Sequence, residues 1–341
     1  MLDSIIILMA SYNGQKYIKE QIDSICNQSI KNWCLFIRDD GSVDDTIQII
    51  QKYCKQDKRI HLLCNNTDNH GAYLNFWTLI DFAKNNYCFD YCFFADQDDI
   101  WPQNKLEIML TYANKFNADI PLLVYGDMEI INENNEVMEH SLNDIMGIGK
   151  MSGLTEFYSS GFVWGCNMMI NRKLIDVIDA FPINHPVVNI MSHDNYYTKV
   201  CLITGKVVFL DHICLLHRRH INNVTSGNVL RLSFKEVIKK TILGFDKLCK
   251  THAIGYVQTL YTLMMMRRKG IITDHTKLIE TAIIKGGLTG VKIMLSQHVK
   301  RKQLIRTIGV YLVMLFNSYQ KPLMKLINKD LYEYSDIIGN I

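Results

Sequence analysis

The sequence predicts an α/β protein in which a mostly parallel sheet is flanked by helices and followed by a helical extension. Short apolar segments alternate with segments of helical periodicity over the first 125 residues, a pattern typical of βαβ units. Polar clusters follow three of the predicted strands, and open parallel sheets bind ligands at that end of their strands. The chain has 341 residues, 48% of them hydrophobic, which is enough for two domains. We divide it into residues 1–228 and a basic, mainly helical region, residues 229–341.

The predicted elements of the first 125 residues follow one another without long loops. Each strand is a short apolar run, and each helix has apolar residues at helical spacing. Asp44 or Asp45 lies where the second helix would be capped, and Pro102 lies where the fourth would start. The strands are predicted at residues 4–10, 33–37, 60–64, 91–95 and 121–125, and the helices at residues 15–27, 44–54, 71–84 and 102–116.

The rest of the chain is less regular at first and then becomes helical. Residues 126–228 mix Gly, Asn and short apolar runs, which indicates hairpins and loops, with helices starting near Arg172 and His193. From residue 231 the apolar spacing is helical. Residues 1–230 carry 18 Lys+Arg and 27 Asp+Glu, whereas residues 231–330 carry 19 and 5. The acidic first part and the basic second part therefore predict different partners.

Cysteine spacing and hydropathy exclude several classes of protein. None of the ten cysteines forms a Cys-x-x-Cys pair, so a zinc cage or redox motif is not expected, and buried thiols in a reducing cytosol are the simplest interpretation. The apolar run at residues 5–10 is too short for an export signal, and the run at 308–316 is about half of a membrane span. No Gly-x-Gly-x-x-Gly or phosphate-binding P-loop pattern follows the first strand. We expect a cytoplasmic protein that is soluble or peripheral to a membrane.

The three polar clusters lie at residues 11–14 (Ser-Tyr-Asn-Gly), 38–42 (Arg-Asp-Asp-Gly-Ser) and 96–99 (Asp-Gln-Asp-Asp). In an extended segment Asp96 and Asp98 would point to one side, and two carboxylates there suit Mg²⁺ or Mn²⁺. The adjacent acids of the second cluster could accept hydrogen bonds from a nucleobase or ribose, with Tyr12 against the base. Turns and helix caps are the alternative interpretation of both acidic clusters. Arg38 is expected at the surface, at the end of a strand.

These motifs resemble family 2 of the inverting glycosyltransferases, which have the GT-A fold. Members have a Ser-Tyr-Asn-type motif after the first strand, then Asp-Asp-Gly-Ser and then Asp-x-Asp, which correspond here to residues 11–13, 39–42 and 96–98. The sequence of residues 95–101, Ala-Asp-Gln-Asp-Asp-Ile-Trp, is similar to the corresponding motif of the rhamnosyltransferase-like branch. The resemblance extends over residues 4 to about 228.

The second half of that region resembles the same branch. Residues 161–171 are similar to the family's acceptor-side strand, and residues 193–197 to its His-Asp segment. Residues 217–223 are similar to its Tyr-Arg-Gln-His-Gly-x-Asn segment, with three departures: His217, Arg219 and Ile221. The departures affect the expected shape of this loop more than the expected role of His220.

The resemblance implies a role for each of ten residues. Asp194 would be the general base that deprotonates the acceptor hydroxyl, although an acid at the start of a helix also has a purely structural explanation. The other roles concern the donor. Nucleotide binding is implied for Ala10, Tyr12, Asp40 and Asp96, binding of Mg²⁺ or Mn²⁺ for Asp98 and His220, and contact with the diphosphate or acceptor for Arg218, Trp101 and Asn223. Trp101 is equally compatible with packing.

The predicted function is transfer of one sugar, with inversion, from a nucleotide-sugar donor to a lipid-linked or cell-surface glycan acceptor, as in capsule or O-antigen synthesis. The branch resemblance makes dTDP-L-rhamnose the first candidate donor and UDP-hexoses the alternative. No Gln-x-x-Arg-Trp follows, which favours a non-processive enzyme. A catalytically silent nucleotide- or glycan-binding scaffold and a nucleotidyltransferase remain alternatives.

The basic region predicts a peripheral contact with the inner surface of a membrane. Basic amphipathic helices suit an anionic lipid surface, where a lipid-linked acceptor would lie. A solvated helix face, or a surface for a partner within a homo-oligomer, is the alternative. Charge alone would also allow nucleic-acid binding, but no nucleic-acid-binding motif accompanies it, so no nucleic acid is expected.

Overall fold

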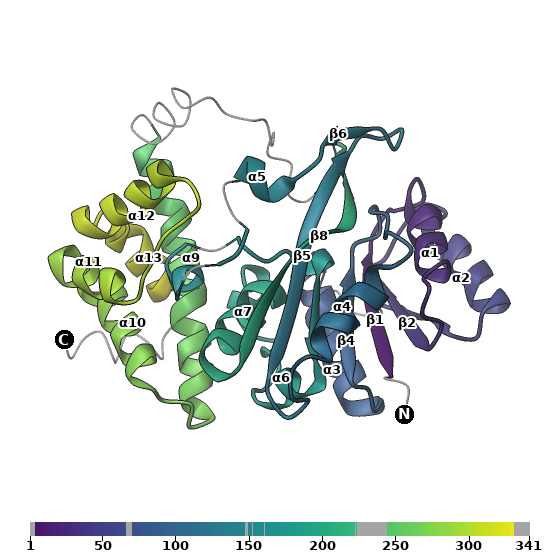
Figure 1. Cartoon of the computed structure of the whole chain (residues 1–341), viewed down its shortest axis with the longest axis horizontal. Helices are drawn as coiled ribbons and strands as arrows, with labels where there is room; N and C mark the ends of the chain where they lie inside the picture. The colour runs from purple at the N-terminus through teal and green to yellow at the C-terminus, as the bar shows by residue number, and fades with distance from the viewer. Residues whose placement is uncertain are drawn as a thin grey trace. The chain divides into compact units, whose positions relative to one another are not determined.

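The computed structural model describes residues 4–65, 70–146, 149–151, 153–159, 161–221, 223 and 244–330. The chain forms two compact units (Figure 1). The first, which we call the sheet unit, contains residues 1–143, 163–197 and 204–228. The second, the helical unit, contains residues 144–162, 198–203 and 229–341. The helical unit therefore includes two short segments that precede residue 229 in the sequence.

The sheet unit is built on one eight-stranded sheet, in the order β3-β2-β1-β4-β7-β5-β6, with β8 paired to β5. The predicted α/β fold with a mostly parallel sheet is confirmed: β1 is parallel to β2 and β4, β2 to β3, and β5 to β8. Two strands depart from this pattern: β7 runs antiparallel between β4 and β5, and β6 runs antiparallel to β5. Figure 1 shows the long strands β5 and β8 side by side. The strands are β1 (Ile5–Ser11), β2 (Trp33–Asp39), β3 (Ile60–Cys64), β4 (Tyr91–Ala95), β5 (Leu122–Ile131), β6 (Val137–Glu139), β7 (Met168–Asn171) and β8 (Lys206–Arg218).

The helices of the first half occur where the periodicity predicts them, but two of them, α1 and α4, begin three residues later. The first follows a turn at residues 15–17, in which the Gly14 carbonyl accepts hydrogen bonds from the amides of Tyr17 and Ile18. The fourth begins at Lys105 rather than Pro102, after a turn in which the Lys105 amide donates a hydrogen bond to the Pro102 carbonyl. The helices are α1 (Ile18–Cys26), α2 (Thr46–Gln56), α3 (Ala72–Asn86), α4 (Lys105–Ala113), α5 (Leu142–Met146), α6 (Arg172–Asp176) and α7 (His193–Thr204), with 3₁₀ turns η1 (Thr155–Phe157), η2 (Gly165–Asn167) and η3 (Pro186–Asn189).

The parallel pairing of the central strands brings the polar clusters together. Ser11 lies in register with Asp39, and Met9 with Ala95, so β1, β2 and β4 end at the same edge of the sheet. Central strands covered on both faces are apolar throughout, and residues 5–9 of β1 are almost completely buried. The rigid, buried strands therefore fix the positions of the three loops.

The helical unit contains five long helices in its described C-terminal part, which confirms the helical prediction for residues 244–330. Residues 231–243 lie outside the described residues. A capping box between Thr273 and Thr276 starts α10, and the Tyr319 hydroxyl donates to the Ile283 carbonyl at 2.7 Å. In the described part of the chain, no helix is long and apolar enough to cross a membrane. The helices are α9 (Phe245–Arg268), α10 (Asp274–Lys285), α11 (Gly287–Ser296), α12 (Leu304–Phe316) and α13 (Gln320–Asp330).

Candidate functional site

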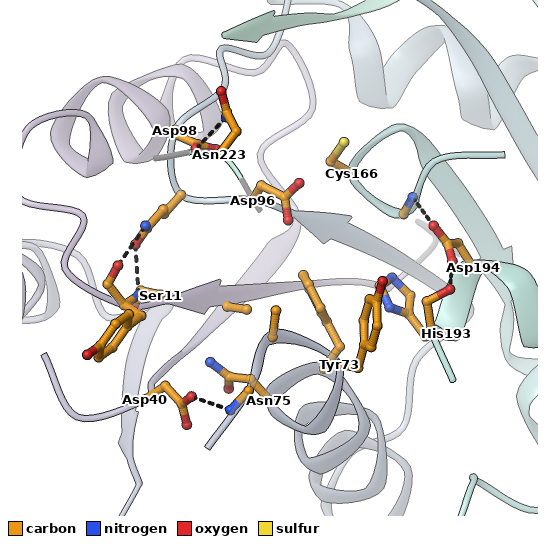
Figure 2. Close-up of a pocket in the computed structure, with 18 of the residues that line it drawn as sticks. Ser11, Asp40, Tyr73, Asn75, Asp96, Asp98, Cys166, His193, Asp194 and Asn223 are labelled. Carbon is orange, nitrogen blue, oxygen red and sulfur yellow. Dashed lines mark hydrogen bonds between the residues drawn. The ribbon is translucent and has the colours of Figure 1, made fainter. Parts of the chain in front are cut away.

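A pocket of about 700 Å³ lies at the carboxyl ends of β1, β2 and β4. Figure 2 shows Ser11 and Asp40 at one side of it, His193 and Asp194 at the other, and Asp96 between them. The structure brings seven of the ten predicted site residues to its wall: Ala10, Tyr12, Asp40, Asp96, Asp98, Asp194 and Asn223. His220, Arg218 and Trp101 do not line it.

Asp40 is held rigidly at the pocket wall by residues that follow it in the sequence. Its Oδ2 accepts a hydrogen bond from the Gly71 amide at 2.8 Å, and its Oδ1 accepts one from the Asn65 side chain at 2.9 Å. Arg38 is 3.3 Å from the same Oδ1 and donates to the Asn75 side chain at 3.0 Å. The surface position expected for Arg38 is therefore wrong: the residue is only 6% exposed, and burial lowers its pKa. Its guanidinium lies along the sheet because Asp40 and Asn75 satisfy it there.

Asp39 has a structural role that differs from that of Asp40. It accepts hydrogen bonds from the amides of Gly41 and Ser42 at 3.1 and 2.7 Å, and from the Ser11 hydroxyl at 3.0 Å. It therefore forms the turn that the alternative interpretation of this motif predicted, and Gly41 adopts the positive φ of 89° that the turn requires. Of the two adjacent acids, the one with a carboxylate at the pocket wall is Asp40.

Sequence reasoning missed Gln97, which joins the first loop to the third. Its side chain accepts from the Tyr12 amide and donates to the Tyr12 carbonyl, both at 2.9 Å. A Cβ on Gly14 would lie 2.1 Å from the Gln97 Oε1, so glycine is needed for this approach. The Tyr12 ring remains 55% exposed at the pocket, where it can stack on a planar group. The position of Gln97 between two acids was the available signal.

The acidic cluster bends as soon as β4 ends at Ala95, so it is not the extended segment that was expected. Asp96 and Asp98 nevertheless both line the pocket. Burial and the nearby carboxylates of Asp99 and Asp98 raise the pKa of Asp96 to about 7. Asp99 turns inward and accepts hydrogen bonds from His217 Nδ1 and from the Arg218 amide at 2.9 and 3.0 Å.

His220 lies behind Asp98 and holds it. His220 Nε2 is 2.8 Å from Asp98 Oδ2, and the Asn223 side chain donates to the same oxygen at 3.3 Å. The Asn223 side chain also accepts from the His220 amide at 2.7 Å. A carboxylate next to an imidazole is a suitable donor set for Mn²⁺ or Mg²⁺, and the carboxylates of Asp96 and Asp98 line the same pocket. The residues present therefore fit a divalent ion.

Arg218 and Trp101 are placed differently from their expected roles in contacting diphosphate or acceptor. Arg218 is fully buried, pairs with Glu20 at 2.8 Å and donates to the Asp98 carbonyl at 2.8 Å. Trp101 is 2% exposed, with Lys105 Nζ 3.9 Å from its ring centre. Neither side chain lines the pocket, because each packs inside the sheet unit, where Arg218 bonds to the acidic loop.

Asp194 is the second residue of α7 and is fixed by three donors. Its Oδ2 accepts from the Gly165 amide at 3.0 Å, and its Oδ1 accepts from the Asn195 amide at 2.6 Å and from the Ser192 hydroxyl. Gly165, which the sequence did not single out, must be glycine because a Cβ there would lie 2.6 Å from His193 Nε2. The carboxylate is both the helix-start acid of the structural interpretation and a pocket residue with a fixed orientation.

Comparisons with known proteins agree with this arrangement. The family model "Glycosyl transferase family 2" matches residues 6–179. The dTDP-rhamnosyl transferase RfbG of Shigella flexneri is 29% identical over 246 residues, which are 70% of this chain and 80% of RfbG. The glucosyltransferase WfgD of Escherichia coli is 35% identical over 131 residues, 38% of this chain and 48% of WfgD. The crystal structure of S. aureus TarS 1–349 with UDP-GlcNAc has a TM-score of 0.51 and 13% identity, over 97% of this chain and 93% of TarS 1–349.

The matched region covers half of the chain and contains β1, β2, β4 and the loops that follow them. The chain therefore belongs to glycosyl transferase family 2 and is a glycosyltransferase, and the likeness to TarS shows that its fold is GT-A.

Proposed function

We propose that the sheet unit transfers a single sugar, with inversion, from a nucleotide-sugar donor bound in the 700 Å³ pocket. The observation that carries this proposal is the presence in one pocket of a base-reading carboxylate (Asp40), an ion-binding carboxylate (Asp98) and a candidate base (Asp194). Asp40 and Asp98 come from the loops after β2 and β4, Asp194 comes from the first turn of α7, and each is held by hydrogen bonds. Residues 1–228 are the catalytic region in this proposal, and residues 229–341 serve the acceptor side.

Within the pocket each residue has one task. Asp40 accepts from the base and Tyr12 covers it, while Asp96 accepts from the ribose. Asp98 and His220 hold the divalent ion, with Asn223 fixing both of them. The ion, when bound, neutralises charge on the departing diphosphate. Asp194 takes the acceptor's proton; its fixed orientation keeps an oxygen in place for a proton that is transferred late.

For the donor, dTDP-L-rhamnose remains the first candidate. It is supported by the similarity to RfbG, named a dTDP-rhamnosyl transferase, over 70% of the chain. UDP-hexoses are the alternative, because WfgD is named a UDP-Glc-dependent glucosyltransferase and TarS was crystallised with UDP-GlcNAc. Both donors carry a pyrimidine base, and the Asp40 carboxylate could accept a hydrogen bond from the imide N–H of that base.

We further propose that the acceptor is a lipid-linked glycan reached at the cytoplasmic surface of a membrane. WfgD is named for transfer to a sugar linked to diphosphoundecaprenol, which is a lipid-linked acceptor. The supporting observation is the exposed side of α11 and α12. Six large apolar side chains on these helices are exposed: Leu288, Leu295, Leu304, Ile308, Leu315 and Phe316. Residues 281–329, which contain both helices, have nine Lys+Arg and no Asp or Glu. An apolar face among basic residues is complementary to anionic lipid.

A donor-turnover screen tests the proposal. The purified protein is incubated with Mn²⁺ or Mg²⁺, an acceptor extract of undecaprenyl-linked glycans, and a panel of UDP-, dTDP- and GDP-sugars. Release of nucleoside diphosphate from one donor, abolished in Asp98→Ala, is the expected result. Release of pyrophosphate would instead identify a nucleotidyltransferase. Nucleotide binding by calorimetry with no turnover of any donor would identify a binding scaffold and contradict the proposal.

A further inference from the structure

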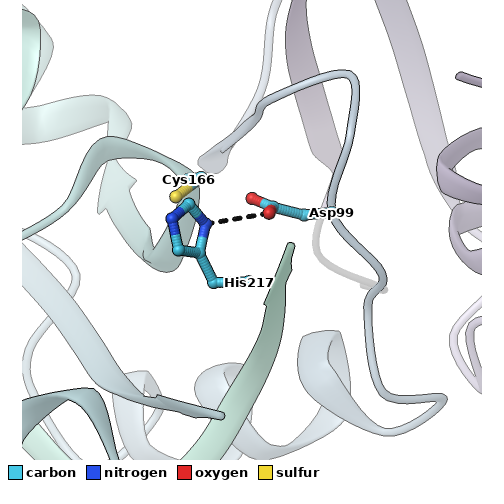
Figure 3. A group of neighbouring side chains, drawn as sticks. All are labelled: Asp99, Cys166 and His217. Atoms are coloured by element: carbon cyan, nitrogen blue, oxygen red, sulfur yellow. Dashed lines mark hydrogen bonds and ion pairs between the residues drawn. The ribbon is translucent and has the colours of Figure 1, made fainter. Parts of the chain in front are cut away.

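A second cluster of metal-binding side chains lies beside the donor pocket and has no part in the proposed transfer. Asp99, Cys166 and His217 are all buried, and one donor atom from each lies within 4.8 Å of the other two. Figure 3 shows the His217 ring between the Asp99 carboxylate and the Cys166 sulfur. The three residues come from the loop after β4, from η2 and from β8, so only the fold brings them together.

Two atoms of this cluster have no partner in the part of the chain that the structure describes. His217 Nδ1 is bonded to Asp99 Oδ1 at 2.9 Å, but His217 Nε2 is buried without a hydrogen bond. Asp99 Oδ2 is likewise buried without one. His217 is only 4% exposed and Asp99 is 0% exposed. A buried polar atom without a partner is costly, so an occupant that accepts the Nε2 lone pair would stabilise the site.

The surroundings of Cys166 favour a cation. The Asp99 carboxylate belongs to the cluster, and Asp96 lines the same pocket wall as Cys166 and His217. Two carboxylates therefore accompany the sulfur and the imidazole. Lys105 donates to the Cys166 carbonyl at 2.8 Å and supplies one buried positive charge. Cys166, His217 and Asp96 also line the pocket, which gives an ion a path to them. Sulfur, nitrogen and oxygen donors together are the ligands of zinc rather than of magnesium.

We propose that Cys166 and His217 bind a zinc-class transition-metal ion, separate from the ion at Asp98. Cys166 Sγ and His217 Nε2 are the inner ligands, Asp96 adds a carboxylate oxygen, and water takes the open position toward the pocket. Asp99 keeps its bond to Nδ1 and orients the ring, as outer carboxylates do for zinc-binding histidines. Donor atoms around zinc are about 3.5 Å apart, so the side chains must draw together by about 1 Å. Binding releases the thiol proton, and any proton on Nε2, to solvent.

The site would have a direct effect on the enzyme, because Asp96 belongs to both sites. A zinc ion that draws Asp96 toward Cys166 removes it from the donor ribose, so zinc and the sugar nucleotide compete. This consequence depends on the proposed function, whereas binding of the metal does not. His217 is also one of the departures from the family segment, where tyrosine is usual, so substitution by tyrosine is a natural test.

Cobalt is the probe that separates this site from the Asp98 site. The full-length, metal-free protein is titrated with Co²⁺, and the thiolate-to-cobalt charge-transfer absorption is recorded. We expect one equivalent of Co²⁺ to produce this absorption and one equivalent of Zn²⁺ to abolish it. Cys166→Ser and His217→Tyr should each lose the absorption, and Asp99→Asn should weaken binding by about 10–100-fold.

Two controls locate the signal. Cys214→Ser removes another buried thiol of the sheet unit, and Asp98→Asn disables the proposed donor-site ion; both should keep the absorption. Circular dichroism checks that each variant is folded, and His217→Tyr provides a second test if Cys166→Ser does not fold. No charge-transfer absorption in the wild-type protein would overturn the proposal. So would an absorption that persists in folded Cys166→Ser or His217→Tyr, or one that disappears in Cys214→Ser.

Discussion

His220 Nε2 lies 2.8 Å from Asp98 Oδ2, although 122 positions separate the two residues in the sequence. The contact connects the segment after β8 to the loop after β4. It forms because the Asp99 carboxylate ties that loop to the end of β8 through His217 and the Arg218 amide. The position of the proposed ion ligand, Asp98, therefore depends on the buried hydrogen bonds of the next residue, Asp99.

The first prediction concerns this pair. We expect His220→Ala to weaken Mn²⁺ binding in the presence of nucleoside diphosphate by about 10-fold or more, because the imidazole is lost as a ligand and Asp98 loses its support. Electron paramagnetic resonance of free Mn²⁺ measures the affinity. His140→Ala, which removes a histidine with a side chain 86% exposed, is the control. Equal Mn²⁺ affinity in both variants would exclude His220 from the ion site.

The second prediction concerns the general base. We expect Asp194→Asn to lower kcat by about 10²–10⁴-fold with little change in donor affinity, since the amide keeps the shape but cannot take the proton. Transfer is followed by release of nucleoside diphosphate, and donor affinity by calorimetry. Asp81→Asn, on the exposed face of α3, is the matched control. If the Asp194→Asn enzyme turns over at the wild-type rate, another group accepts the proton.

The third prediction concerns the stability of the sheet unit. We expect Arg218→Met to reduce the free energy of unfolding by about 1–3 kcal/mol, because it leaves the carbonyl of Asp98 without its donor. Glu20→Gln should cost less, since the Glu20 side chain is 45% exposed and Arg218 keeps its carbonyl partners. Urea denaturation measures both. A smaller loss for Arg218→Met than for Glu20→Gln would show that the guanidinium does not brace the acidic loop.

The fourth prediction concerns acid sensitivity. Burial lowers the pKa of His193 to about 4, and its ring packs against Phe76 and Phe94 with centroids 4.4 Å away. In the unfolded chain the His193 imidazole is protonated near pH 6.5, whereas in the folded protein it is protonated only near pH 4. The free energy of unfolding therefore decreases as pH falls between these values. The separation corresponds to roughly 3 kcal/mol.

A non-titrating variant should remove this component. We expect His193→Gln to make the free energy of unfolding fall less steeply below pH 6.5, although His252, whose pKa burial also lowers, keeps part of the slope. Chemical denaturation at several pH values measures it, with the exposed His140→Gln as control. A slope equal to that of the wild type would mean that His193 is protonated in the folded protein.

The fifth prediction concerns the membrane. We expect Leu304→Ser with Phe316→Ser to reduce binding to phosphatidylglycerol vesicles by at least 10-fold. Burial of each exposed side chain in lipid contributes about 1.5–3 kcal/mol to the free energy of binding. Cosedimentation measures the bound fraction, and wild-type binding should also weaken at high salt. Met138→Ser, at an exposed apolar residue of the sheet unit, should have no effect. Equal binding of the double variant would remove α12 from the proposed contact.

Much of the fold was predictable because its signals are local. Buried parallel strands appear in the sequence as continuous apolar runs and surface helices as spaced ones, so the elements of the first 125 residues and their alternation were assigned correctly. Strand β5, however, continues to Ile131 instead of ending at residue 125. Strand β7 was less accessible: residues 168–171 are only four apolar-rich positions, and its antiparallel direction depends on which neighbours it meets in the sheet. The delayed starts of α1 and α4 depend on turns at Gly14 and Pro102 that periodicity does not show.

The sequence by itself determined the fold class, the family and the loops that carry the acidic and aromatic site residues, because residue type and short spacing are local properties. Only the tertiary structure decided which of those side chains face the pocket. Asp40 faces it and Asp39 closes a turn, while Asp98 faces it and Asp99 turns inward to His217. Arg38 and Arg218 are buried because each finds an acceptor inside the sheet unit: the Asp40 carboxylate for Arg38 and the Asp98 carbonyl for Arg218. The direction of a side chain depends on partners far along the chain, and those partners exist only once the sheet has assembled.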